Sequence, residues 1–232
     1  MNDLRYMPLF VFLSGLLSSG MCFSADNHPG NAEPSPGSPL SVSGEVKEVR
    51  LHKNEAAGEM VIDVFMTVHF KNHSSSPLLV FVSKDWPCQG GQTLASSRQD
   101  AVSKKYVYVS GAWRSSDKPA WEDTRRKLDQ KSPPPDLIRL IGPDAELSFE
   151  KTVVLGVEIK GSFDETSKPW DVIKKTDPLW LQLNFMLWPN NLEQNGLNPK
   201  FGRRLQRRWK DQGQLIIGNI ISEPIPLSLP AT

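Results

Sequence analysis

The stretch from Met60 to Trp86 constrains the fold more than any other part of the chain. From Met60 to Phe70 apolar and polar residues alternate, and because successive side chains of a strand point to opposite faces, this alternation predicts a strand buried on one side. The polar segment 71–77 breaks the pattern, and a second apolar run, Leu78–Val82, follows it. We therefore expect these two strands to pair with each other in an antiparallel sheet.

Further apolar runs separated by turn residues predict more strands. The sequence contains no internal repeat and no regular alternation of strands with helices, which indicates an all-β chain of roughly seven or eight strands with one or two short surface helices. The order of these elements resembles the immunoglobulin-like and fibronectin-like modules of exported bacterial proteins. That resemblance implies an antiparallel β-sandwich and transfers no functional residue, and a jelly roll is the alternative fold. The further strands are expected at 42–52, 106–113, 137–141, 147–159, 179–188 and 215–221.

The segments between these strands have a different character. Residues 115–135 are polar and charged and end in three prolines, which favours an extended, solvated insertion outside the core. A polar loop is expected between Gly91 and Tyr106. Residues 167–175 have a proline near the start and lysines near the end of a short predicted helix. Prolines in the tail after residue 221 are expected to keep it out of a sheet interior.

The first residues have the features of a secretory signal peptide. Arg5 precedes an apolar segment, 7–17, that is too short to cross a bilayer as a helix, so we expect an exported protein, either periplasmic or secreted. Cys22 follows that segment and offers the alternative of a lipoprotein anchored through its sulfur. The predicted parts are a signal peptide at 1–24, a disordered tether rich in Pro, Gly and Ser at 25–40, and a single domain at 41–232.

Charge and cysteine content narrow the classes of function. The 27 basic and 26 acidic residues give a formal net charge of +1, so an electrostatic function would have to reside in a local patch. Without the signal peptide Cys88 is the one cysteine, which leaves no partner for an intramolecular disulfide. We interpret Cys88 as an inert small hydrophobe, with a nucleophile beside His69 or His73 as the alternative. The histidines lack the spacing of metal ligands, so we expect no metal and no cofactor.

The most distinctive local pattern is a basic helix between Asn198 and Gly213. Asn198 suits the cap of a helix, Pro199 its first position and Gly213 its exit. The interpretation without a ligand is a surface helix packed on the domain by one apolar face and solvated on the others. The apolar residues recur at a spacing of four and are Phe201, Leu205 and Trp209. The cations on the remaining faces are Arg203, Arg204, Arg207, Arg208 and Lys210.

The functional interpretation of the same helix is an anion site. Guanidinium groups offer paired donors that suit phosphate, sulfate and carboxylate groups. For an exported protein, the candidate ligands are anionic glycans, lipid head groups or an acidic envelope protein. No nucleic-acid motif is present, so we do not expect nucleic acid as a partner. The cations of the charged insertion, Arg125, Arg126 and Lys127, would extend this surface.

Tryptophans form a second candidate surface. Trp180 and Trp188 share the side of the strand predicted at 179–188 that faces away from the predicted core, an arrangement compatible with stacking on sugar rings. The alternative is burial, because tryptophans commonly fill the ends of a β-sandwich.

We found no sequence motif for a catalytic nucleophile, a metalloprotease, a phosphate loop or a dinucleotide site. The leading hypothesis is therefore a noncatalytic, exported binding or interaction module whose contact surface is the basic helix. A hydrolase of cell-surface material, with an acid-lined cleft, is one alternative. A structural envelope protein is the other.

Overall fold

The structure, a computed structural model, describes residues 38–81, 91–110, 118–159, 168–187 and 199–230. The predicted signal peptide at 1–24, most of the tether at 25–40, and Cys22, Cys88 and Trp188 lie outside these residues. The described part contains eleven strands and four helices, and most of its ordered residues are in strands. Several strands have only two to four residues, too few for an alternating pattern to be recognised, which is why the count exceeds the predicted seven or eight.

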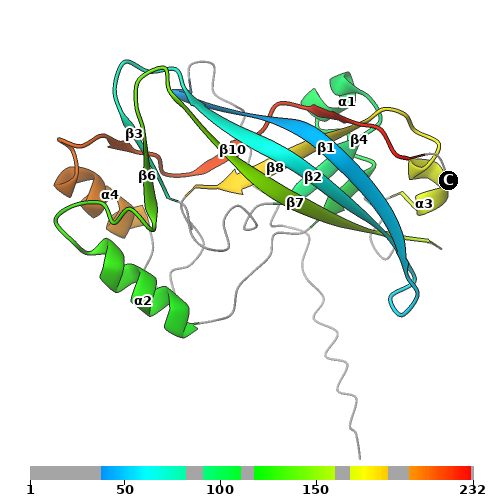
Figure 1. Cartoon of the computed structure of the whole chain (residues 1–232), viewed down its shortest axis with the longest axis horizontal. Helices are drawn as coiled ribbons and strands as arrows, with labels where there is room; N and C mark the ends of the chain where they lie inside the picture. Colours follow the sequence, from blue (N-terminus) through cyan, green and yellow to red (C-terminus); the bar gives the residue numbers. More distant parts are fainter. Residues whose placement is uncertain (1–37, 82–90, 111–117, 160–167, 188–198, 231–232) are drawn as a thin grey trace, which may run out of the picture. The chain divides into compact units, whose positions relative to one another are not determined.

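Three long strands form an antiparallel sheet in the order β1-β2-β7, and its curved ribbons cross the upper half of Figure 1. The alternation predicted for β2 is confirmed. The even-numbered residues from Ile62 to Phe70 are fully buried, whereas the odd-numbered residues from Asp63 to His69 on the opposite side are only partly buried. A bulge interrupts the β1–β2 register between Val46 and Glu48. The strands are β1 (Leu40–Asn54), β2 (Glu59–Asn72) and β7 (Glu146–Glu158).

The predicted pairing of the two central strands with each other is wrong. β3 (Leu78–Phe81) pairs instead with β6 (Ile138–Ile141) and with β9 (Gln214–Leu215) in a separate sheet. Both edges of β2 are already occupied, by β1 on one side and β7 on the other, so β2 has no edge left for β3. The 71–77 segment therefore carries the chain from one sheet to another.

The third sheet is built around β8 (Leu179–Met186), in the order β10-β8-β4-β5, and β11 also pairs with β8. The alternating core set predicted for residues 179–187 is confirmed, because its five members are all buried. The expected polar loop before Tyr106 is instead largely ordered as β4 and α1. The sequence shows only Leu94 and Ala95 as an apolar pair there, which is too short to indicate a strand. The elements absent from the prediction are β4 (Gln92–Ala95), α1 (Arg98–Val102) and β11 (Ile225–Leu227). β5 (Tyr108–Ser110) and β10 (Asn219–Ile221) lie within strands that the sequence predicts.

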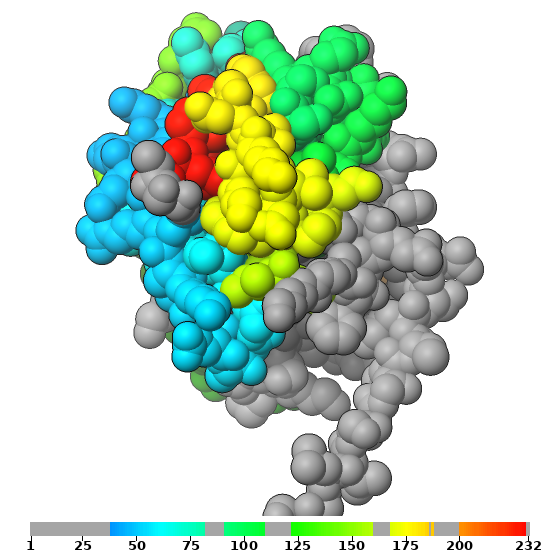
Figure 2. All heavy atoms as spheres, turned by 90° about the vertical axis from the view of Figure 1, so that its right-hand side faces the viewer, coloured from blue at the N-terminus to red at the C-terminus, as the bar shows by residue number. Residues whose placement is uncertain are grey.

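One large hydrophobic core joins the sheets, with contributions from β1, β2 and β7 on one side and β4, β8 and β11 on the other. The short helix predicted at 167–175 is confirmed as α3 (Trp170–Ile173), and its Trp170 and Ile173 side chains enter this core. The tail prediction also holds, because β11 pairs with β8 alone and so lies at a sheet edge. In Figure 2 the red C-terminal segment lies between blue β1 and the yellow residues of α3 and β8. These findings confirm a mostly β fold with several antiparallel sheets.

A second, smaller core cluster lies on the other side of β3. Leu78 and Val80 face the large core, whereas Leu79 and Phe81 face the small one, so β3 is buried on both faces. The small core is closed by two helices, α2 (Lys118–Leu128) and α4 (Pro199–Arg208), seen together on the left of Figure 1. Its members are Leu79, Phe81, Leu128, Leu137, Ile138, Phe201, Leu205, Trp209 and Leu215.

The predicted extended insertion at 115–135 is therefore partly wrong. Residues 118–128 form α2, and Leu128 at its end is completely buried in the small core. Leu128 supplies a contact with this core, and the six residues before it, 122–127, are all polar or charged, so the sequence shows no periodic apolar pattern here. The small core thus brings α2 and α4 together, and this junction is where the predicted basic surface lies.

Candidate functional site

The helix α4 begins at Pro199 and ends at Arg208, within the predicted bounds. Its apolar residues face inward: Phe201 is 5% exposed, and Leu205 and Trp209 are fully buried. A helix that lies on a membrane would need this apolar face for insertion into lipid. Since the face is already packed in the small core, α4 can meet a membrane only through its charges.

The structure divides the predicted cations into two sets. The first is the inner pair, Arg204 and Arg208, which hold the carboxylate of Asp129, the residue that follows α2. Arg208 Nη1 lies 2.6 Å from Asp129 Oδ1, and Arg204 Nη2 lies 3.3 Å from Oδ2. Arg208 also donates to the carbonyl of Gln130 at 3.2 Å, as does the indole nitrogen of Trp209 at 3.2 Å. The inner pair therefore fastens α4 to the end of α2.

The guanidinium of Arg208 hydrogen-bonded to Asp129 holds the pKa of that carboxyl below its ordinary value, and the charges of Arg204 and Arg125 act in the same direction. Asp129 is thus an internal anion that already occupies part of the predicted anion site. The Arg204 guanidinium also lies 4.8 Å from the centre of the Phe201 ring, a distance at which cation–π attraction operates.

The second set is the outer row, which we define as Lys200, Arg203, Arg207 and Lys210. Their spacing of three, four and three residues places them along one side of α4 and its exit turn. All four are exposed, and within the described residues none forms an ion pair with a carboxylate. Sequence reasoning overlooked Lys200, although its position three residues before Arg203 was the available signal.

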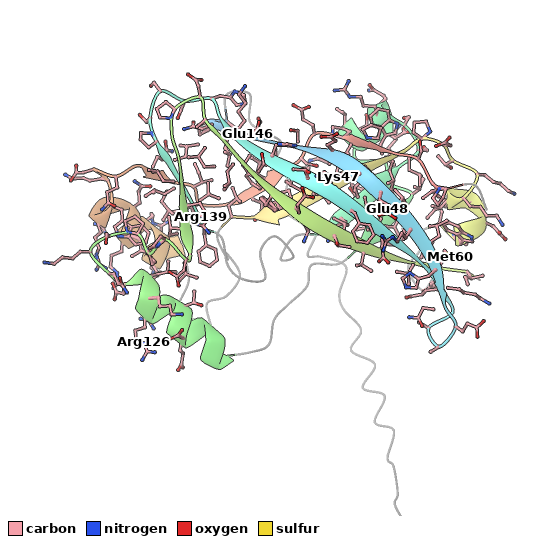
Figure 3. The ribbon with its side chains drawn as sticks, in the orientation of Figure 1. Lys47, Glu48, Met60, Arg126, Arg139 and Glu146 are labelled. Carbon is pink, nitrogen blue, oxygen red and sulfur yellow. The ribbon has the colours of Figure 1, made fainter. Side chains whose placement is uncertain are left out.

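The cations of α2, in the segment predicted as an insertion, contribute less than expected to the basic surface of α4. Arg126 and Lys127 both pair with Asp123 on α2, at 2.6 and 3.0 Å. Arg125 is exposed and lies 5.9 Å from the centre of the Phe201 ring, next to α4. Figure 3 shows Arg126 on α2 and Arg139 on β6 at this same end of the molecule. Of these three cations, Arg125 alone has no carboxylate partner among the described residues, so it is the one that can extend the outer row.

A shallow hollow of about 260 Å³ opens beside the last member of the outer row. It lies between the turn that precedes β3 and the exit of α4. Gly213 brings the two segments into close contact there, because a Cβ at this position would lie 2.8 Å from the carbonyl oxygen of Pro77. The lining residues are Ser76, Pro77, Gln206, Lys210, Asp211, Gln212, Gly213 and Gln214.

The outer face of the β1-β2-β7 sheet carries a separate polar network. His69 Nδ1 lies 2.7 Å from Glu146 Oε1 and 2.9 Å from Ser148 Oγ (Glu146 is labelled in Figure 3). The carboxylate and the hydroxyl share one ring nitrogen, so the imidazole does not connect them as the relay of a serine hydrolase would. Lys47 and Glu150 form an ion pair of 2.6 Å further along the same face. These contacts are those of a cross-strand polar surface.

The structure adds little support for the predicted tryptophan surface. Trp180 is half-buried on β8, paired between Ala95 and Pro226, and Trp188 lies outside the described residues, so the aromatic platform stays a prediction. Within the residues that the structure describes, no group of histidine, cysteine and acidic side chains could hold a metal ion. None of the described helices is long and apolar enough to cross a membrane.

Comparisons with known proteins give little. No family model matches the chain, and no curated protein matches it. Among solved structures, target SoR45 of the Northeast Structural Genomics Consortium is similar at 9% sequence identity and a TM-score of 0.33, with 83% of this chain and 88% of that chain covered.

Proposed function

We propose that this protein is an exported, noncatalytic binding module that contacts an anionic ligand through the outer row of α4. A β-sandwich of immunoglobulin-like or fibronectin-like type is the fold we propose for its domain. The candidate ligands are anionic glycans, lipid head groups or an acidic envelope protein. The proposal depends on the outer row being exposed and having no carboxylate partner in the described part of the chain, while the inner pair is used to attach the helix.

The observation that carries the proposal is the position of Lys200. It lies in the first turn of α4, where the partial positive charge of a helix N-terminus disfavours cations, and this turn contains no acidic residue. Arg207 lies in the last turn, where a cation is favourable, so helix stability accounts for Arg207 but not for Lys200, and Arg203 lies in the middle of the helix between them. A cation in an unfavourable position, without a carboxylate partner among the described residues, is better explained by a ligand than by folding.

The test measures binding of the purified protein to arrayed anionic glycans and to vesicles containing an anionic phospholipid, at low and moderate salt. The variant Lys200→Ala, Arg203→Ala, Arg207→Ala, Lys210→Ala removes the outer row and retains the buried apolar face and the inner pair. We expect salt-sensitive binding that this variant loses while remaining folded.

The matched control removes four exposed lysines elsewhere, Lys71→Ala, Lys105→Ala, Lys168→Ala, Lys175→Ala, and so lowers the net charge equally. It should retain binding. Equal loss of binding in both variants would show that net charge, rather than the outer row, attracts the ligand. No binding by the unchanged protein would contradict the proposal and turn attention to uncharged protein partners.

A further inference from the structure

The geometry of the outer row points to a particular class of ligand. The row runs along a convex helix surface rather than lining a concave site. From Lys200 to Arg207 the rise along the axis is roughly 10 Å at about 1.5 Å per residue. Side chains on a convex surface diverge, so four cations in a row cannot converge on one sulfate or phosphate. They can each contact a different charged group of an extended chain.

The hollow at the end of the row adds a second kind of contact. Lys210 belongs both to the row and to the lining of the hollow, so a chain that follows the row reaches it. The exposed Ser76, Gln212 and Gln214 side chains offer neutral hydroxyl and amide groups there. Asp211 is the one carboxylate of the lining, and it disfavours a further anionic group at this point. A hydroxyl-rich, uncharged group suits this end better than another phosphate.

We infer that the ligand of the outer row is a linear anionic polysaccharide. Its acidic groups contact Lys200, Arg203 and Arg207 in succession, and the hydroxyl groups of a sugar residue occupy the hollow beside Lys210. This inference rests on the proposed function and narrows its ligand. A polymer of phosphates would satisfy the cations but would not use the neutral lining of the hollow.

The experiment compares four probes with the full chain: inorganic sulfate, a sulfated heparin disaccharide, size-defined longer heparin oligosaccharides, and polyphosphate of matched charge. We expect the longer oligosaccharides to bind at least about tenfold more tightly than the disaccharide, because successive cations are engaged within one complex. Removal of the outer row should abolish this dependence on length. Affinity should also fall with salt, with a slope reduced by about one for each cation removed.

A second variant tests the hollow alone. Ser76→Ala combined with Gln212→Ala leaves every charge in place and should weaken oligosaccharide binding by about fivefold while leaving polyphosphate binding unchanged. Thermal unfolding that matches the unchanged protein would show that the variant is folded.

The outcomes separate the inference from the proposed function. If sulfate and long oligosaccharides bind equally per site, and removal of the outer row weakens both, the linear ligand is wrong and the anion surface remains. If polyphosphate binds as tightly as the oligosaccharide and the Ser76 and Gln212 variant has no effect, the polysaccharide is wrong. If none of the four probes binds while vesicles containing the anionic phospholipid do, the polysaccharide is wrong and the proposed function stands. If neither the probes nor the vesicles bind, both the inference and the proposed function fail.

Discussion

Arg208 on α4 donates to Asp129, the residue after α2, across 2.6 Å, and this contact separates the cations that attach the helix from those that remain for a ligand. The Arg208 side chain is 33% exposed and that of Asp129 is 42% exposed, so the pair lies at the surface. Because exposed pairs contribute little to stability, typically under about 1 kcal/mol, its main effect is to fix which guanidiniums face outward.

Asp129→Asn should increase anion binding. The substitution keeps the size of the side chain and removes the charge that occupies Arg204 and Arg208, so two further guanidiniums become available to a ligand. We expect tighter binding of heparin oligosaccharides and a salt slope steeper by up to about two. Isothermal titration at several salt concentrations measures both quantities.

Glu223→Gln is the matched control for that prediction, because Glu223 is an exposed carboxylate whose backbone N–H bonds to Val42 on β1, in a different part of the fold from α4. It raises the net charge equally and should leave the salt slope unchanged. An equal increase in binding for both variants would mean that Asp129 does not mask the inner pair.

Acid should weaken the attachment of α4 through the same carboxylate. The pKa of Asp129 is lowered in the folded protein, chiefly by the hydrogen bond from Arg208. A carboxyl with a lowered folded-state pKa stabilises the protein fully above its ordinary pKa of about 4, and the stabilisation is lost as pH falls through the folded-state value. With a side chain 42% exposed, the loss should stay below about 1 kcal/mol.

Urea unfolding at pH 7 and at about pH 3 measures this effect as a difference between the unchanged protein and Asp129→Asn. The variant cannot titrate at this position, so its free energy of unfolding should fall less on acidification. A parallel fall in the two proteins would assign the acid sensitivity to other carboxyls, among which Glu146 also has a lowered pKa because of its hydrogen bond to His69.

The helix α4 could be predicted from the sequence because its signals are local. The proline at its start, the apolar face at a spacing of four and the exit glycine all lie within one short segment. Its counter-ion could not be predicted, because Asp129 is 75 residues from Arg204 in a charged segment with no periodic pattern. The division of the cations into two sets depends on that distant contact, and so required the structure.

The strands show the same limit. β2 can be predicted nearly to its bounds, because the residues from Met60 to Phe70 alternate clearly between apolar and polar. Its partners in the sheet are β1 and β7, and β7 begins 74 positions beyond the end of β2. The sequence therefore predicts pairing with the next strand along the chain, β3, which is not a neighbour of β2 in the sheet. Which strands pair depends on which strand edges have no partner yet, and the local sequence of a strand does not contain this information.

Trp209 should be critical for holding α4 on the small core. It is fully buried, and its indole nitrogen donates to the Gln130 carbonyl at 3.2 Å. Trp209→Ala should lower the free energy of unfolding by about 3–5 kcal/mol, because it leaves a large cavity. Trp209→Phe retains most of the apolar area and should cost about 1–2 kcal/mol, mainly for the lost hydrogen bond and ring volume. Chemical unfolding followed by circular dichroism measures both; equal, small effects would mean that the small core is not needed for stability.

Asn72 should be the most sensitive polar residue, because it fixes the change from one sheet to the next. It is completely buried at the end of β2. Its Nδ2 donates to the carbonyls of Ser76, Ile141 and Gly142 at 2.8, 3.1 and 2.9 Å, and its Oδ1 accepts from the backbone N–H and the hydroxyl of Ser74. These bonds tie the turn before β3 to the end of β6.

Asn72→Ala would leave buried backbone groups without partners, so we expect a loss of about 2–3 kcal/mol in the free energy of unfolding. Asn72→Asp should be at least as harmful, because a carboxylate cannot donate to the three carbonyls and would face them as a buried charge. The comparison is Asn54→Ala at the exposed end of β1, where Asn54 accepts one bond, from the Ala57 N–H at 3.3 Å, and where the loss should stay below about 1 kcal/mol. Similar losses at positions 54 and 72 would show that the turn is held by its strands and not by the Asn72 side chain.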